Sequence, residues 1–372
     1  MKKIYSLYIF VASLFFVTGC TKEEDKTGND SNLNRKELLT NYTDSYILPA
    51  YDALKASLTT LETATDSFIA SPDETNLLQL RNMWKAAYIV WQRTDLLEFG
   101  PAEDVSLRMY LNVYPTSPSK INANIQSGYY NLDAFGNNDA QGFPAMDYLL
   151  NGSGSSDAEI VALYSTDPLA SQRTDYLKAI VSTMSSRVTD VRNEWDDYKS
   201  TFVNATGTDV NSSISVMTNA FVLYYERFLR STKVGIPAGA MTGVALPEQT
   251  ETNYRPELAR ELLLTALEAV NSFYEGYHFH TLQNGVGMKD YLATIGTKDE
   301  NGVLISDIIS TELEEAKTAV GTLNGTIKDA AQNNRPALLS VYDQLQDLVP
   351  LFKVDMVSAF GISITYVDND GD

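Results

Sequence analysis

Two acidic side chains occupy a face that a helix would turn toward neighbouring helices. Trp84, Tyr88 and Trp91 recur at steps of four and three residues, and Asp95 continues the same face four residues later. Glu98 lies about one turn further on. A carboxylate on such a face is costly unless it is ion-paired, hydrogen-bonded or bound to a cation. We therefore take Asp95 and Glu98 as candidate site residues.

A third carboxylate follows a proline in the segment Gly142-Phe-Pro-Ala-Met-Asp147. Pro144 suits the first turn of a short helix. Asp147 is three residues further on, so it lies on the same side of that helix. Two interpretations stay open at this point: Asp147 belongs to a site, or it is an acid placed favourably near a helix N-terminus.

Histidine and cysteine are too scarce for most metal and nucleophile chemistry. His278 and His280 are the only histidines, and Cys20 is the only cysteine. A three-histidine zinc site and a Ser-His-Asp triad are therefore not supported. The His-x-His pair either lends two metal ligands or consists of ordinary histidines at a helix end. No HExxH motif, phosphate-binding loop or nucleophile elbow is present, and we predict no catalytic residue.

The position of Cys20 predicts a lipid anchor. Residues 1–19 have a basic start and an apolar run, and they end in Val-Thr-Gly directly before the cysteine. This is the pattern of a lipoprotein signal peptide, and lipidated Cys20 would hold the protein at a membrane. The alternative is an ordinary signal peptide whose cysteine is incidental.

Residues 20–35 are polar and predict a disordered tether. Their acidic run, residues 22–25, either resembles an export signal of surface lipoproteins or is a charged linker. The whole chain has a formal charge of −20, which disfavours nucleic acid as a partner.

The remainder is predicted to be all-α. Apolar residues recur at helical steps in seven segments, and these are 47–68, 77–91, 177–202, 214–228, 258–273, 309–323 and 338–352. Stripes of this width predict two antiparallel helical bundles, residues 36–207 and 208–372. Residues 100–156 are expected to be irregular, and the alternation in 362–367 predicts one short strand. The acidic end, residues 368–372, is expected to be a solvated tail.

Several segments together resemble the imelysin family. They are Trp91–Pro101, with an acid before a Phe-Gly-Pro turn; Gly142–Leu150, similar to the signature Gly-x-His-x-x-Glu; Tyr225–Pro237; and the closing Asp-Asn-Asp-Gly-Asp. The resemblance implies two helical bundles with a cleft between them, a link to iron or haem uptake, and an export signal. It also implies that Arg227, in the third segment, belongs to the cleft with Asp95, Glu98, Pro144 and Asp147.

The chain departs from the family signature at its ligand positions. Pro144 replaces the histidine, and Asp147 replaces the glutamate. The pair Asp95 and Asp147 would leave an oxygen-only metal site, so the cofactor is left open between a divalent cation, iron and none. We expect a non-catalytic outer-membrane lipoprotein, periplasmic or surface-exposed, that binds a ligand or a partner of iron or haem uptake. The alternatives are a metal-dependent peptidase and a surface scaffold or adhesion subunit.

Overall fold

The computed structural model describes residues 35–281 and 283–367. These residues belong to one compact unit. Their regular structure is helical, and two isolated bridges are the only β-type pairing among them. The all-α class is therefore confirmed. The predicted signal peptide, Cys20, nearly all of the tether and the acidic tail lie outside the described residues.

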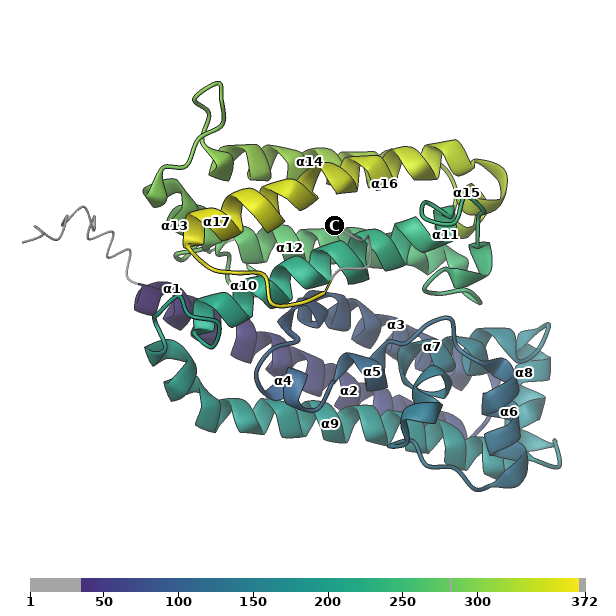
Figure 1. Cartoon of the computed structure of the whole chain (residues 1–372). Coiled ribbons are helices and arrows are strands. Elements are labelled where there is room, and N and C mark those ends of the chain that lie inside the picture. The colour runs from purple at the N-terminus through teal and green to yellow at the C-terminus, as the bar shows by residue number, and fades with distance from the viewer. Residues whose placement is uncertain (1–34, 282, 368–372) are drawn as a thin grey trace, which may run out of the picture. The chain divides into compact units, whose positions relative to one another are not determined.

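Long helices of the N-terminal half pack around α2 (Figure 1). The helices of this half are α1 (Arg35–Asn41), η1 (Tyr42–Ile47), α2 (Leu48–Ala70), α3 (Glu74–Thr94), α8 (Asp157–Ser165) and α9 (Ala170–Asn204). Asp73 caps α3 by accepting a hydrogen bond from the Asn76 backbone N–H. The helix η1 is a π-helical turn within an otherwise continuous helix.

The segment predicted to be irregular consists of short helical turns joined by loops. These are α4 (Pro101–Asp104), α5 (Arg108–Leu111), α6 (Pro118–Ser127), η3 (Phe135–Ala140), α7 (Gly142–Asp147) and η4 (Tyr148–Gly152). The turn η2 (Asp95–Leu97) comes before this segment, directly after α3. Apart from α6, none is long enough to produce a clear apolar period, which is why the sequence pattern shows no helix there.

The C-terminal half begins after the loop 205–212. Its helices are α10 (Ser213–Leu223), η5 (Tyr224–Gly235), α11 (Ile236–Ala238), η6 (Pro247–Gln249), η7 (Pro256–Leu258), α12 (Ala259–Glu275), α13 (Met288–Ile295), α14 (Ile305–Thr322), α15 (Ile327–Asn333), α16 (Arg335–Pro350), η8 (Leu351–Met356) and α17 (Val357–Phe360). The predicted boundary at 207 lies in the connecting loop, and the division into two domains stays a prediction.

All seven apolar stripes lie on helices. In Figure 1, α9 forms one side of the described unit and α14 and α16 the other, with α2, α3, α10 and α12 between them. Nearly every predicted stripe residue is buried; the partly exposed ones are Tyr198 and Phe228. Phe228 lies in π-helical η5, where it packs against the core and also lines a pocket.

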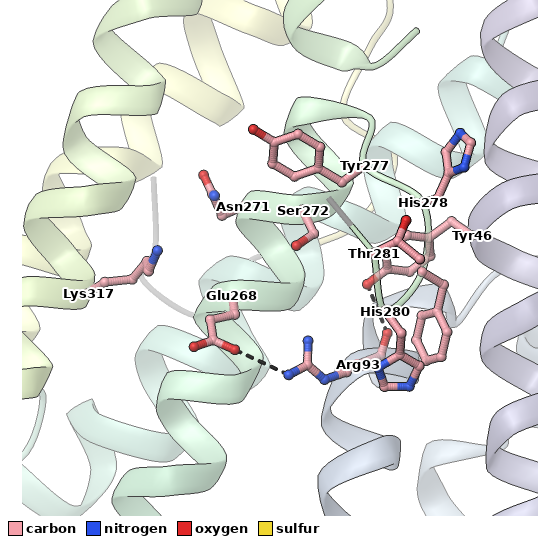
Figure 2. A pocket seen from close by; sticks show the side chains of 11 residues that line it. Tyr46, Arg93, Glu268, Asn271, Ser272, Tyr277, His278, His280, Thr281 and Lys317 are labelled. Carbon is pink, nitrogen blue, oxygen red and sulfur yellow. Dashed lines mark hydrogen bonds and ion pairs between the residues drawn. The ribbon is translucent and has the colours of Figure 1, made fainter. Parts of the chain in front are cut away.

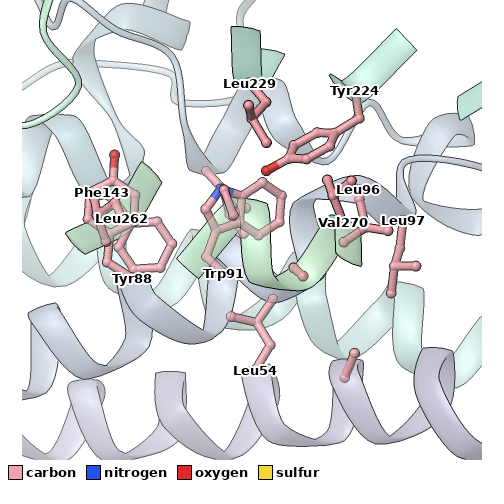
Figure 3. Packing of buried hydrophobic residues seen from close by; sticks show 14 of the residues in the cluster. Leu54, Tyr88, Trp91, Leu96, Leu97, Phe143, Tyr224, Leu229, Leu262 and Val270 are labelled. Carbon is pink, nitrogen blue, oxygen red and sulfur yellow. The ribbon is translucent and has the colours of Figure 1, made fainter. Parts of the chain in front are cut away.

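The two halves share one continuous apolar core. Trp91 of α3 lies between Leu54 of α2 and Leu229 of η5, and Leu262 of α12 belongs to the same buried cluster (Figure 3). All four residues are at most 1% exposed. Since burial of such side chains contributes about 1.5–3 kcal/mol each, this junction holds α3 firmly against the C-terminal half.

Residues 362–367 do not form the predicted strand. The side chain of Asn219 takes the place of a strand partner: its amide donates to the Ser363 carbonyl at 3.0 Å and accepts from the Thr365 N–H at 2.8 Å. A side-chain amide can both donate and accept a hydrogen bond, so Asn219 holds this segment against α10 without the backbone hydrogen bonds of a β-sheet.

The first helix begins at the last residue of the predicted tether. Arg35, placed at the end of the predicted tether, is the first residue of α1, where it donates to the Tyr291 hydroxyl at 2.6 Å and to the Thr206 carbonyl at 3.0 Å. Of the described helices, none is both long and apolar enough to cross a bilayer.

Gly142 fixes the start of α7. Its φ is +73°, a region that favours glycine, and a Cβ at this position would lie 2.3 Å from the Leu111 carbonyl oxygen. No side chain fits between α5 and α7 at this point. The first residue of the Gly-x-x-x-x-Asp segment is therefore required by packing.

We predict that Gly142→Ala lowers the free energy of unfolding by more than about 4 kcal/mol, because it combines a clash with backbone strain. The matched control is Gly128→Ala: Gly128 has φ +68° but open space around it, so only the strain of about 1–2 kcal/mol should appear. Urea unfolding of both variants measures the difference; equal losses would contradict the close approach of α5 and α7.

Candidate functional site

A cavity of about 180 Å³ lies where α5 and the following loop face η5. Its walls include Asp95, Arg108 and Asn112 from the N-terminal half and Phe228 and Lys233 from the C-terminal half. We call it the central pocket. The predicted site residue Asp95 therefore does line a pocket between the two halves.

Arg108 is the most constrained side chain of the central pocket. Its Nε donates to Asp95 Oδ1 at 2.5 Å, and its Nη2 donates to the Asp95 carbonyl oxygen at 2.5 Å. The guanidinium carbon lies 3.8 Å from the centre of the Phe228 ring, a cation–π contact. Among the described residues, Nη1 has no hydrogen-bond partner. The guanidinium is thus held in place with one nitrogen left over.

Asp95 and Glu98 both accept hydrogen bonds from Arg108. Burial raises the pKa of the Asp95 carboxyl, and the neighbouring guanidinium opposes that rise. Both carboxylate oxygens of Glu98 accept from the backbone N–H of Arg108 at 3.1 Å. Burial raises the pKa of Glu98 to about 7. The two predicted carboxylates therefore bind the same residue, one at its side chain and the other at its backbone.

A buried ion pair forms the back of the site. Lys233 Nζ lies 2.6 Å from Glu251 Oε2, and each side chain is 2% exposed. Lys233 also donates to Gln92 Oε1 at 2.7 Å, and Gln92 Nε2 donates to Glu251 Oε1 at 3.0 Å. These three side chains close a ring of hydrogen bonds between α3, η5 and the loop before α12.

The same carboxylate binds two more side chains of the N-terminal half. Asn112 Nδ2 and the Tyr88 hydroxyl donate to Glu251 Oε1 at 2.9 and 3.2 Å. Tyr88 in turn stacks on Phe143 of α7, with ring centres 4.5 Å apart. Glu251 therefore accepts four donors in all, which is the condition for keeping a charge stable away from water.

Asp147 lies elsewhere and has its own partners. It is the last residue of α7 and not a first-turn acid, so the helix N-terminus interpretation does not describe it. Its Oδ2 accepts from the Tyr254 N–H at 2.9 Å and its Oδ1 from Asn151 Nδ2 at 3.1 Å. Burial raises its pKa to about 7. Asp147 thereby links α7 to the loop before α12.

The structure brings only part of the predicted site together. Asp95 lines the central pocket, whereas Pro144, Asp147 and Arg227 do not. Pro144 is buried in α7 and offers no ligand atom, and Arg227 donates to the Val367 carbonyl at 3.2 Å. Arg227 is thereby tied to the C-terminal segment.

The residues present do not fit a resident metal ion. Asp95 is bound by a guanidinium, and Asp147 is bound by a backbone N–H and an amide. Within residues 35–281 and 283–367, no three His, Cys, Asp or Glu side chains gather as metal ligands would. The oxygen-only pair Asp95 and Asp147 remains a prediction that these contacts do not favour.

The sequence analysis did not identify four polar residues of the site, which are Gln92, Arg108, Lys233 and Glu251. Gln92 gives a weak signal, because a buried polar residue follows Tyr88 at a helical step of four. Lys233 lies in the Tyr225–Pro237 segment, but nothing in its spacing indicates burial. Arg108 and Glu251 lie outside the long helices, where no periodic pattern exists to place them.

Fold and site together define a class: an all-α protein of two packed helical halves with a charged pocket between them. The same fold occurs in a putative iron-regulated protein A precursor from Parabacteroides distasonis, with a TM-score of 0.69 and 18% identity over 88% of this chain and 95% of that one. An imelysin-like protein from Psychrobacter arcticum has a TM-score of 0.67 and 19% identity, covering 89% and 97%.

The family follows from the sequence match. The model of the imelysin family (peptidase M75) matches residues 47–349, and the chain belongs to this family. A shorter stretch of the chain is similar to iron-regulated protein A from Synechococcus elongatus. The two are 27% identical over 105 residues, which is 28% of this chain and 27% of that protein. The chain thus matches about a quarter of that protein's length.

We predict that Glu251→Ala lowers the free energy of unfolding by about 3–5 kcal/mol, because it leaves Lys233 charged and buried without its partner. Glu248→Ala, three residues earlier, is the control. Glu248 is 66% exposed and pairs with Lys328, so its loss should cost less than about 1 kcal/mol. Chemical unfolding checks both values, and a small loss in Glu251→Ala would contradict a buried ion pair.

We predict that Asp147→Asn stabilises the protein at pH 8. A carboxyl whose pKa rises on folding favours the native state below its unfolded pKa, and this contribution is lost as pH rises to about 7. The neutral amide avoids that loss, so its advantage should grow between about pH 4 and 7, toward about 4 kcal/mol, and then stay constant. Unfolding at pH 5 and pH 8 measures it.

Asp299→Asn is the control, because the pKa of Asp299 is lowered in the folded protein, whereas that of Asp147 is raised. The backbone N–H of Val303 lowers the pKa of Asp299, so this variant should lose stability, and the loss should be largest above the unfolded pKa. An Asp147→Asn effect that does not depend on pH would show that Asp147 is not a desolvated acid.

Proposed function

We propose that this protein is a membrane-anchored, non-catalytic member of the imelysin family that binds a small anionic ligand in the central pocket and serves iron acquisition. The free Nη1 of Arg108 is the observation that supports the binding part. Asp95 and Phe228 hold the guanidinium rigidly at the wall of the pocket. A preorganised guanidinium with one unused nitrogen suits a ligand with a carboxylate or another anionic oxygen group.

The volume of the central pocket supports a small ligand. A cavity of 150 Å³ accommodates benzene, and sites for drug-sized ligands have about 300–1,000 Å³. At about 180 Å³ the central pocket suits a ligand of a few heavy atoms. Haem is far too large for it, so a role in haem uptake would use another surface.

The contacts of Asp95, Pro144 and Asp147 support binding rather than hydrolysis. A metallopeptidase needs a metal with an open coordination position and a base for the attacking water. Here Asp95 and Asp147 already accept hydrogen bonds from protein donors, and Pro144 supplies no ligand atom. No contact in the central pocket favours the peptidase alternative.

The iron link and the location have separate support. Two relatives carry the name iron-regulated protein A, and this chain shares the fold of one and part of the sequence of the other. The lipoprotein pattern at Cys20 supports an outer-membrane anchor with the folded part on the periplasmic side or the cell surface.

We predict that acetate, used as the probe, binds the purified protein with a dissociation constant that Arg108→Lys raises by on the order of tenfold, because lysine keeps the charge but loses the planar guanidinium. Isothermal titration calorimetry measures this. Arg187→Lys is the matched control: Arg187 also pairs with an aspartate, Asp133, and lies 3.4 Å over an aromatic ring, Tyr110, but it is outside the central pocket. Equal affinities in all three proteins would contradict the proposed site.

A further inference from the structure

We propose that a second pocket, formed by the loop 277–281, α12 and the end of α3, binds a small ligand that carries an anionic oxygen group. This loop pocket has a volume of about 370 Å³ and shares no lining residue with the central pocket. It contains both histidines of the chain, His278 and His280, together with Arg93, Glu268 and Lys317 (Figure 2).

The charge of the loop pocket is opposite to that of the chain. Arg93 and Lys317 line it against the single acid Glu268, whereas the whole chain has a formal charge of −20. Tyr277 and Asn271 add polar groups to the same wall. A local positive excess on a strongly acidic protein concentrates small anions there.

Arg93 is only weakly paired at this place. Its Nη2 pairs with Glu268 Oε2 at 3.2 Å, and Glu268 is 48% exposed, so the ion pair is weak. An anionic oxygen in the pocket would compete with Glu268 for this guanidinium.

The walls of the loop pocket are held by long-range contacts. Asn41 Nδ2 donates to the carbonyls of Gly276 and Val286 at 3.3 and 3.1 Å, which clamps both ends of the loop. The Phe279 N–H donates to the Ser45 carbonyl at 2.7 Å. The loop is thereby fixed to the N-terminal half, and a ligand would meet a preformed surface.

A cation fits the loop pocket poorly. The imidazoles of His278 and His280 point in different directions (Figure 2) and do not converge on one point. Arg93 and Lys317 would repel a metal ion. Among the described residues, no three His, Cys, Asp or Glu side chains gather as metal ligands would, and the histidine pair has no third ligand beside it.

The two histidines make the proposal testable by NMR. Because the chain has no others, the imidazole resonances of a protein without a histidine tag report on this pocket alone. We expect inorganic phosphate or citrate, titrated separately, to shift them in a saturable manner with a dissociation constant of about 1 mM or tighter. The ligand should also raise the pKa of His280, which burial and Arg93 lower in the free protein.

Two variants test the site. Lys317→Gln should weaken the response on the order of tenfold. Lys178→Gln removes the same charge from α9, where Lys178 forms an exposed ion pair with Asp66 of α2, and it should leave the response unchanged. Saturation by phosphate alone would indicate a phosphate-type ligand, and saturation by citrate alone a carboxylate; either outcome supports the site. Absence of saturation with both probes, or an equal response in Lys317→Gln, would overturn it.

Discussion

Charges removed from water must find partners, and this requirement organises the contact between the two halves. Lys233 and Glu251 are buried to the same extent as the surrounding core, and Glu251 is stable there because it accepts four donors. Three of these donors, Tyr88, Gln92 and Asn112, come from the N-terminal half. Without the C-terminal half these three donors would lose their acceptor, and without the N-terminal half Glu251 would keep only Lys233. The halves are therefore coupled by polar groups as well as by the apolar core around Trp91.

The same requirement explains the contacts of Asp95 and Asp147. A buried carboxylate must be satisfied by partners in the protein. Asp95 is satisfied by Arg108, and Asp147 by the Tyr254 N–H and Asn151. The cationic group that lines the central pocket beside Asp95 is the guanidinium of Arg108. A guanidinium favours binding of an anion.

The sequence predicts the helical part of this structure well because long amphipathic helices leave a period that can be read directly. It also identifies Asp95 as a residue that needs a partner, since a carboxylate interrupts an apolar face. It does not identify the partner: Arg108 lies in a four-residue helix between loops, where no period exists. Glu251 lies in a loop as well, and its meeting with Lys233 depends on long-range packing. The strand predicted at 362–367 failed for a similar reason, because the side chain of Asn219 occupies the place of a neighbouring strand.

The central claim is that Asp95 and Asp147 accept hydrogen bonds from groups of the protein and bind no metal ion. Metal analysis of the protein after anaerobic purification tests it most directly. The account predicts iron and zinc well below one equivalent, with no change in Asp95→Asn or Asp147→Asn. One equivalent of either metal in the wild type, lost in both variants, would contradict it.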